Sequence, residues 1–190
     1  MSDTQRITRE SLERKTADDI RDRAQKIQLL LLDVDGVLTD GRVTYTANGD
    51  EIKRFHVRDG SGLKIWRDLG LGVAVISGRN SPAVDRRMAE LDVSPVFQGR
   101  SDKAVALYEL LGQTGLTADK ICTVGDDLPD LPIMLRCGLC VAVADACPEV
   151  RGIAAYTTTE KGGRGAVRET IEWLLKLRGQ WTAAVDKFRV

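Results

Sequence analysis

Residues 27–40 read IQLLLLDVDGVLTD, a short apolar run that passes directly into a group of acids. A continuous apolar run of this length is typical of a strand that is buried on both faces of a parallel sheet. Two similar runs follow, GVAVI at 72–76 and ICTV at 121–124, and the segments between the runs have the composition of helices. Strands that alternate with helices predict an α/β fold, a three-layer sandwich around a mainly parallel sheet.

The length of 190 residues suits one domain with a sizeable core, flanked by two short segments. Residues 1–26 are rich in charge and offer little apolar surface, so they predict a polar N-terminal helix. Residues 27–177 carry the alternating strands and helices and form the predicted catalytic domain. Residues 178–190 are predicted as a C-terminal tail.

One part of the domain breaks the alternation of strand and helix. Residues 41–56 alternate in character around Asn48-Gly49, a dipeptide typical of two-residue hairpin turns. The sequence therefore predicts a hairpin at about 41–56. The glycine-rich stretch 59–62 is expected to open a helix over Leu63–Leu69.

The charge balance excludes several classes of partner. Lys and Arg total 28, as do Asp and Glu, so the formal net charge is zero and nothing points to nucleic acid or anionic lipid. The longest purely apolar run, Leu29–Leu32, is too short to cross a membrane, and no secretory signal is visible. Four cysteines without an export signal predict reduced thiols in the cytoplasm.

Polar and charged residues follow four of the predicted strands. Asp33-Val34-Asp35 follows the first, Ser77-Gly78-Arg79 the second, and Gly125–Asp130 the run at 121–124, while Asp102-Lys103 lies near a short strand at 96–98. In open parallel sheets, ligands bind beyond the carboxyl ends of the strands. We therefore expect these four segments to converge at one edge of the sheet.

The residue types in these segments suit phosphoryl transfer. A phosphate monoester repels a carboxylate, so Asp33 can attack one only if cations neutralise both. Magnesium held by Asp33, Asp126 and the backbone carbonyl of Asp35 would do this. Lys103 would place a second positive charge on the transferring phosphoryl group, and Ser77 would donate a hydroxyl hydrogen bond to it.

Three further acids have expected roles around that nucleophile. Asp35 would protonate the leaving oxygen and then activate water against the aspartyl-phosphate. Asp130, one helical turn beyond Asp126, would hold a metal-bound water or orient Lys103, and Asp127 is expected behind the residues that contact the ion or the substrate. Each motif alone also fits a loop or a helix cap, but four in this order favour a catalytic site.

At these residues the sequence resembles the haloacid dehalogenase-like superfamily, whose four motifs match DVDGV, SGR, DK and GDDxxD in order. The resemblance covers residues 27–177 and implies a Rossmann-like core, Mg²⁺ and an aspartyl-phosphate intermediate. FHVRDG at 55–60, VAVADA at 141–146 and GGRGAVRE at 162–169 are similar to the family of 3-deoxy-D-manno-octulosonate 8-phosphate phosphatases of lipopolysaccharide biosynthesis. Related phosphatases act on nine-carbon sialic or deaminated sialic acid 9-phosphates, so both substrates stay open.

The resemblance also predicts how the site is enclosed. The segment from Asp35 to Ser77 is too short for the cap domain that many superfamily members carry, so no cap is expected. The resembling enzymes are homotetramers whose neighbours cover each site. The hairpin Val43–Phe55 would then assemble the tetramer, and the tail from about 178 would reach a neighbouring site.

By the same resemblance, cations near the site would bind the carboxylate and phosphate of a small sugar acid. The residues expected to line this substrate pocket are His56, Val57, Arg58, Asp59, Gly60, Lys64, Arg79 and Arg87.

Two rival interpretations belong to other classes of function. A phospho-accepting receiver-like domain or a non-catalytic interaction module shares buried acids and a lysine, but lacks the paired Asp33 and Asp35 followed by Ser-Gly-Arg. A DxD glycosyltransferase needs a sugar-nucleotide domain for which this chain is too short.

Overall fold

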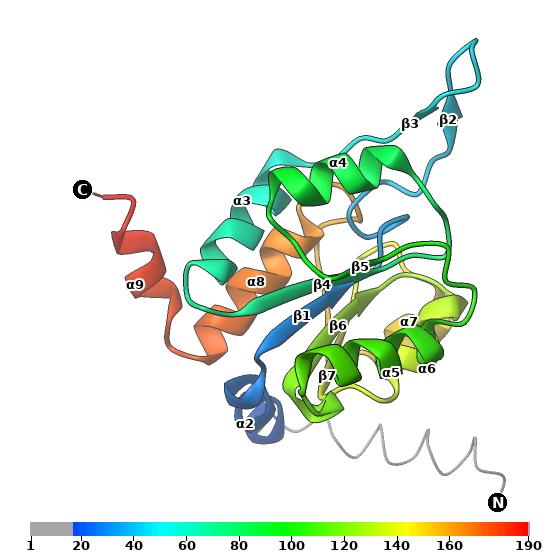
Figure 1. Cartoon of the computed structure of the whole chain (residues 1–190). Coiled ribbons are helices and arrows are strands. Elements are labelled where there is room, and N and C mark those ends of the chain that lie inside the picture. The colour runs from blue at the N-terminus through cyan, green and yellow to red at the C-terminus, as the bar shows by residue number, and fades with distance from the viewer. Residues whose placement is uncertain (1–16, 190) are drawn as a thin grey trace, which may run out of the picture.

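A computed structural model describes residues 17–189, and within them the chain forms an α/β sandwich (Figure 1). Its main sheet has six strands in the order β5-β4-β1-β6-β7-β8, and every neighbouring pair is parallel. The predicted fold class is thereby confirmed. The strands are β1 (Leu29–Leu32), β4 (Gly72–Ile76), β5 (Val96–Phe97), β6 (Ile121–Gly125), β7 (Leu139–Ala142) and β8 (Tyr156–Thr157).

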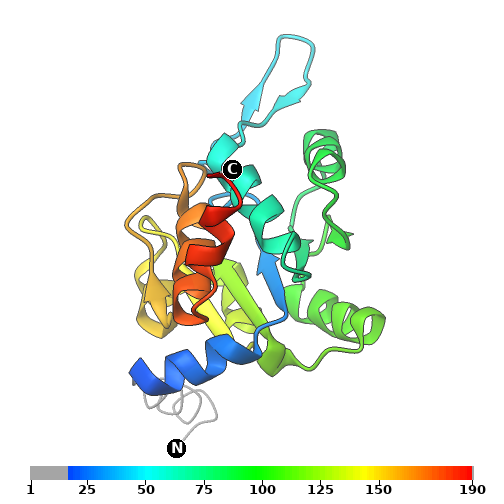
Figure 2. The ribbon, with the colours of Figure 1, turned by 90° about the vertical axis from the view of Figure 1, so that its left-hand side faces the viewer.

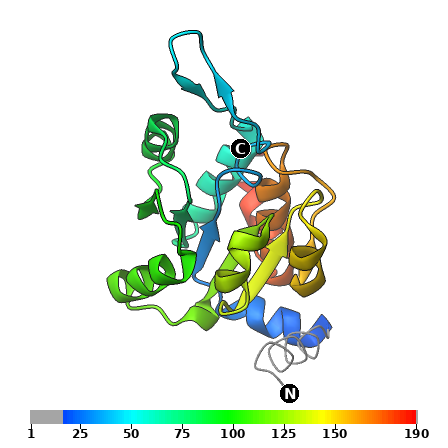
Figure 3. The ribbon, with the colours of Figure 1, turned by 90° about the vertical axis from the view of Figure 1, so that its right-hand side faces the viewer.

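Helices cover both faces of this sheet. One face carries α3 (Val57–Arg67), α4 (Pro82–Glu90) and α8 (Ala166–Leu177), and α8 stands in front of the sheet in Figure 2. The other face carries α5 (Lys103–Thr114), α6 (Leu131–Met134) and α7 (Pro148–Ile153), with α6 and α7 in front in Figure 3. The 3₁₀ turns η1 (Ala118–Lys120) and η2 (Leu128–Asp130) precede β6 and α6.

Strand β1 is the centre of the core and explains the opening apolar run. All four of its leucines are buried, because β4 and β6 flank it on either side and helices cover both faces. Leu32 pairs with Val75 of β4 and with Val124 of β6. Since these strands are parallel and in register, the residues that follow them emerge at one level of the same edge.

Helix α3 begins at Val57, six residues before the predicted start at Leu63. The prediction took Gly60 and Gly62 as helix openers, but both lie buried inside the helix. A Cβ added at Gly62 would lie 3.1–3.3 Å from atoms of Arg168 and Ile171. The missing side chain therefore lets α8 pack closely on α3.

Strands β2 (Thr44–Tyr45) and β3 (Glu51–Ile52) form the predicted hairpin, which projects from the body of the molecule (Figure 1). The amide of Thr46 donates to the carbonyl of Asp50, so three residues form the loop, not the expected two. Gly49 has a φ of +87° in this loop, which suits a three-residue turn closed by a left-handed glycine. No cap domain lies among the described residues, as predicted.

The two ends of the described chain pack on the domain. Helix α2 (Ala17–Lys26) is the only part of the predicted N-terminal helix that can be located, because residues 1–16 lie outside the described residues. The predicted tail contains a helix, α9 (Trp181–Asp186), that the sequence did not indicate. The Trp181 ring lies 5.3 Å from the Arg168 guanidinium of α8 in the same subunit. Among the described helices, none is long and apolar enough to span a membrane.

Candidate active site

The four polar segments meet at the carboxyl edge of the sheet. Asp33 follows β1, Ser77 follows β4, Asp126 follows β6, and Lys103 begins α5. Together they border a cavity of about 300 Å³. Its lining consists of Asp33, Asp35, Gly41, Ser77, Gly78, Arg79, Lys103, Asp126, Asp127, Pro129 and Asp130.

Lys103 joins two of these acids. Its Nζ lies 2.8 Å from Asp33 Oδ1 and 2.7 Å from Asp130 Oδ1, and its side chain is only 4% exposed. Asp102 caps the helix just before it and accepts from the amide of Ala104 at 2.9 Å. The cap fixes the start of α5, and thereby the direction from which the ammonium enters the site.

Asp130 organises the loop that carries Asp126. Its Oδ2 accepts from the amides of Asp126 at 2.9 Å and Asp127 at 3.4 Å, while its Oδ1 accepts from Lys103. Asp127 and Asp130 also form a reciprocal capping box around η2. Asp130 therefore orients Lys103, one of its two expected roles, and Asp127 supports the loop.

Oxygens of Asp33, Asp126 and Asp130 lie within 4.8 Å of one another. Burial, together with the charges of Asp33 and Asp130, raises the pKa of Asp126 to about 8. Burial and the charge of Asp130 also raise the pKa of Asp33 to about 6, although Lys103 opposes this. Burial lowers the pKa of Lys103, but the charges of Asp33 and Asp130 outweigh it, so the net shift is upward.

This donor set fits a divalent cation. Three carboxylates face one another with a single ammonium between two of them, so negative charge is left over. Hard carboxylate oxygens are the ligands that magnesium prefers. Asp33 and Asp126 come from different strands and lie close enough to share an ion.

Asp35 also lines the cavity and belongs to a second charged cluster. Its carboxylate pairs with the buried ammonium of Lys53, and its Oδ2 lies 3.8 Å from Arg79 Nε. Glu51 completes the cluster, with Oε1 2.7 Å from Arg79 Nη2 and 3.5 Å from Lys53 Nζ. The sequence did not indicate Lys53 or Glu51, because the sequence of a hairpin strand does not show which loop the strand will contact in the fold.

The predicted substrate residues are spread over a wider surface than one pocket. Within the described subunit, Arg79 is the only one of them that lines the catalytic cavity. Asp59 is buried and its Oδ1 accepts from the amide of Arg168 at 2.8 Å, so it caps α8. A Cβ at Gly60 would meet Arg87, which pairs with Glu90 at 3.1 Å.

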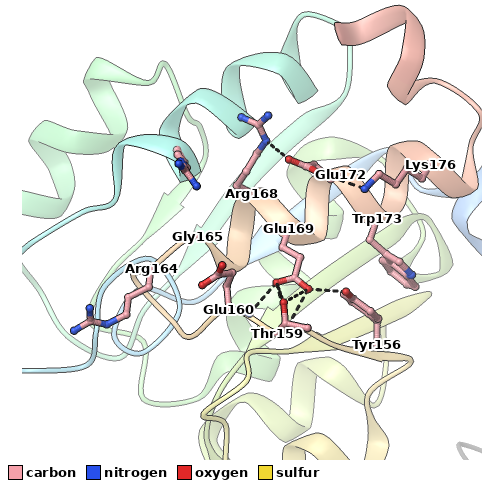
Figure 4. Close-up of a pocket in the computed structure, with 11 residues that line it drawn as sticks. Tyr156, Thr159, Glu160, Arg164, Gly165, Arg168, Glu169, Glu172, Trp173 and Lys176 are labelled. Atoms are coloured by element: carbon pink, nitrogen blue, oxygen red, sulfur yellow. Dashed lines mark hydrogen bonds and ion pairs between the residues drawn. The ribbon is translucent and has the colours of Figure 1, made fainter.

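The remaining members of that set point elsewhere. Val57 is 78% exposed and Lys64 is exposed on α3, while His56 precedes α3 with its Nδ1 buried. Arg58 lines a separate cavity of about 510 Å³ along α8 (Figure 4). Arg164 and Arg168, from the GGRGAVRE stretch, border the same cavity.

Comparison with known proteins identifies the family. The family model described as haloacid dehalogenase-like hydrolase matches residues 92–171. The 3-deoxy-D-manno-octulosonate 8-phosphate phosphatase of Haemophilus influenzae is 42% identical over 85% of this chain and 89% of that protein. The enzyme of the same name from Escherichia coli K12 is 44% identical over 85% and 86%. The chain belongs to the haloacid dehalogenase-like hydrolases.

Solved structures of other hydrolases in this family superpose closely. One of them is the 3-deoxy-D-manno-octulosonate 8-phosphate phosphatase of Moraxella catarrhalis in complex with magnesium ion, phosphate ion and KDO. Its TM-score is 0.88 and its sequence identity 39%, and the match covers 91% of this chain and 99% of that one. The cobalt-bound Haemophilus influenzae enzyme has a TM-score of 0.81 and 43% identity, and the match covers 84% of this chain and 93% of that one. This haloacid dehalogenase-like hydrolase is thus a phosphatase, as the four motifs predicted.

The raised pKa of Asp126 makes the stability of the metal-free hydrolase depend on pH. An unfolded Asp releases its proton at about pH 4, whereas the folded protein keeps this one up to about pH 8. The folded state therefore binds more protons between these values, and its free energy of unfolding falls as the pH rises through this window. Asp126→Asn removes the charge. At pH 8 the free energy of unfolding of the variant should therefore exceed that of the parent by at least about 1.4 kcal/mol, the equivalent of one pKa unit.

Urea unfolding in the presence of EDTA at pH 8 and at pH 4 measures this difference, which should vanish at the lower pH. Asp68→Asn changes an exposed carboxylate just beyond α3 and serves as the control, with an effect within about 0.5 kcal/mol. An Asp126→Asn protein that is less stable than the parent at pH 8 contradicts the electrostatic account.

Proposed function

We propose that this chain hydrolyses 3-deoxy-D-manno-octulosonate 8-phosphate to the free acid sugar and phosphate, with magnesium and with Asp33 as covalent nucleophile. The observation that carries the proposal is the ammonium of Lys103 between Asp33 and Asp130, beside the carboxylate of Asp126. The names of the relatives, 42–44% identical over 85% of the chain, support the substrate. The same proposal places the enzyme in the cytoplasm, in line with four cysteines that are free thiols.

Asp33, Asp126 and the backbone carbonyl of Asp35 would hold the magnesium ion. When bound, the ion supplies positive charge between the nucleophile and the phosphate, so that the two anions can approach. Asp130 takes part by holding the Asp126 amide and the Lys103 ammonium in place. Asp127 stabilises the same loop through the capping box.

In the first step, a carboxylate oxygen of Asp33 forms a bond to phosphorus while the bond from phosphorus to the sugar oxygen breaks. Lys103 Nζ and the Ser77 hydroxyl donate to the phosphoryl oxygens and stabilise their charge. Asp35, which lines the same cavity, gives its proton to the departing sugar oxygen. It then takes a proton from the water that attacks the aspartyl-phosphate, which releases phosphate and restores Asp33.

The substrate's carboxylate and hydroxyls are assigned to Arg79 and to a set of residues that lie outside the cavity within the described subunit. Arg79 lies at the cavity itself, and its planar guanidinium suits a carboxylate or phosphate. The residues from His56 to Gly60, with Lys64 and Arg87, complete the proposed set. Of these, Asp59 and Gly60 act through packing, because both are buried between helices.

A homotetramer built on the hairpin would cover the open cavity. Val43, Tyr45 and Ile52 are 46%, 60% and 44% exposed on an arm that projects from the body. Apolar side chains gathered on such an arm favour contact with another protein surface. Since the Trp181 helix packs on its own subunit, only residues beyond α9 remain to extend toward a neighbour.

Variants at the nucleophile and its partners test the mechanism. Asp33→Asn and Asp126→Ala should abolish turnover, because each removes an essential carboxylate. Lys103→Ala should lower kcat by about 10²–10³-fold, as does loss of one preorganised donor elsewhere. Lys26→Ala, at the exposed end of α2, should leave kcat unchanged. Steady-state phosphate release measures this, and Asp35→Asn should still bind substrate in calorimetry. Turnover that survives in Asp33→Asn would rule out covalent catalysis at this residue.

A substrate panel tests the identity of the sugar. With magnesium, kcat/KM should be higher for 3-deoxy-D-manno-octulosonate 8-phosphate than for sialic acid 9-phosphate and deaminated sialic acid 9-phosphate. Activity should disappear with EDTA and return with magnesium. Preference for a nine-carbon substrate would reassign the sugar and leave the chemistry in place.

Assembly through the hairpin is tested by a charge on its apolar surface. Ile52 is exposed in the single subunit and would be buried in the proposed interface. Ile52→Arg would place a charge in that interface and should convert the tetramer to smaller species. Tyr108→Arg, at a 60% exposed position on α5, is the matched control and should remain tetrameric. Light scattering measures the mass. A parent protein that is monomeric at micromolar concentration contradicts the assembly.

A further inference from the structure

We propose that the turn Gly162-Gly163, together with Asp145, positions the loop that carries Asp33 and Asp35. This inference rests on the proposed function, since that loop holds its nucleophile and its acid–base residue. The turn comes just before α8, more than 120 residues along the chain from the loop it contacts. Figure 4 labels Arg164 and Gly165, the two residues that directly follow the turn.

The two glycines touch the backbone of the catalytic loop directly. A Cβ added at Gly162 would lie 1.6 Å from the carbonyl oxygen of Gly36, and one at Gly163 would lie 2.4 Å from the amide nitrogen of Asp40. The amide of Gly163 also donates to the carbonyl of Val37 at 2.9 Å. The turn therefore packs so closely on the loop that neither glycine could carry a Cβ without a shift of the loop backbone.

The same loop also lies against Asp126. Gly36 has a φ of +92°, and a Cβ there would lie 2.0 Å from Asp126 Oδ2. Gly36 is therefore in close contact with both the carboxylate of Asp126 and the turn at Gly162. The position of the loop sets how far Asp33 stands from Asp126.

Asp145 links the turn to the loop after β6. Its Oδ1 accepts from the amide of Gly162 at 3.0 Å, and the amide of Cys147, two residues further on, donates to the carbonyl of Asp126 at 2.8 Å. One short segment after β7 therefore holds both the Asp126 loop and the turn that presses on Gly36. This arrangement fixes the two carboxylate-bearing loops relative to each other without any contact to substrate, so these are positioning residues.

Gly162→Ala tests the close approach. The added methyl would displace the Gly36 carbonyl by more than about 1 Å, and a displacement of that size can lower the rate about 10²-fold. We therefore expect kcat for p-nitrophenyl phosphate to fall about 10²-fold, while KM changes far less. Magnesium affinity in calorimetry should fall as well. Hydrogen exchange should speed up at Val37, Leu38 and Thr39, whose amides bond to Val34, and stay slow in β4.

Gly112→Ala is the matched control, since Gly112 lies inside α5 with nothing within 4 Å of an added Cβ. It should match the parent in kcat, magnesium affinity and exchange. A Gly162→Ala protein with parental kcat and exchange overturns the inference, and so does exchange that rises equally throughout the sheet. A parent without phosphatase activity would instead refute the proposed function, while the magnesium and exchange measurements still test the turn.

Asp145 provides a second test that adds no atoms to the contact. Asp145→Ala removes the acceptor for the Gly162 amide, so kcat should fall less than in Gly162→Ala and exchange at residues 37–39 should again speed up. Asp145→Asn keeps an acceptor oxygen and should restore both. If the alanine and asparagine variants both behave like the parent, the link through Asp145 is wrong.

Discussion

The repulsion among Asp33, Asp126 and Asp130 is the constraint around which this molecule is arranged. Three carboxylates within 4.8 Å of one another, in a site that removes much of their hydration, oppose folding, as the raised pKa values of Asp33 and Asp126 show. Among the described residues, Lys103 is the one cation that contacts this trio directly. The negative charge that Lys103 leaves uncompensated gives the site its affinity for a divalent ion. The same charge that destabilises the metal-free protein therefore also binds magnesium.

Backbone geometry, more than side-chain packing, holds these charges in place. The parallel register of β1 with β4 and β6 brings Asp33, Ser77 and Asp126 to one level. The close contacts around them depend on positions without a side chain: Gly125 against Asp130, Gly36 against Asp126, and Gly162 against Gly36. Glycines recur in these motifs because carboxylates and backbone must approach within distances that a Cβ would forbid.

The sequence predicted features whose cause is local and missed those whose cause is distant. The bounds of β4 came out as predicted, because a bounded apolar run carries its own signal. That Asp33 and Asp126 lie close together could be predicted, because each directly follows a strand of the parallel sheet. The early start of α3 could not be predicted, since Gly60 and Gly62 disfavour a helix until Arg87 and Leu91 pack against Gly60 and α8 packs against Gly62. The contacts of Lys53 with Asp35, and of Gly162 with Gly36, depend on chain segments that only the tertiary fold brings together.

The hairpin connects this chemistry to whatever covers the site. Lys53 and Glu51 of the hairpin contact Asp35 and Arg79, while Val43, Tyr45 and Ile52 beside them are 44–60% exposed. A fold without a cap must obtain its enclosure from outside. Any surface that packs on the exposed hairpin therefore also acts on the segment that holds Asp35, the residue proposed to move the proton. The ion pairs of Lys53 with Asp35 and of Glu51 with Arg79 therefore connect the proposed assembly surface to the proposed acid–base residue.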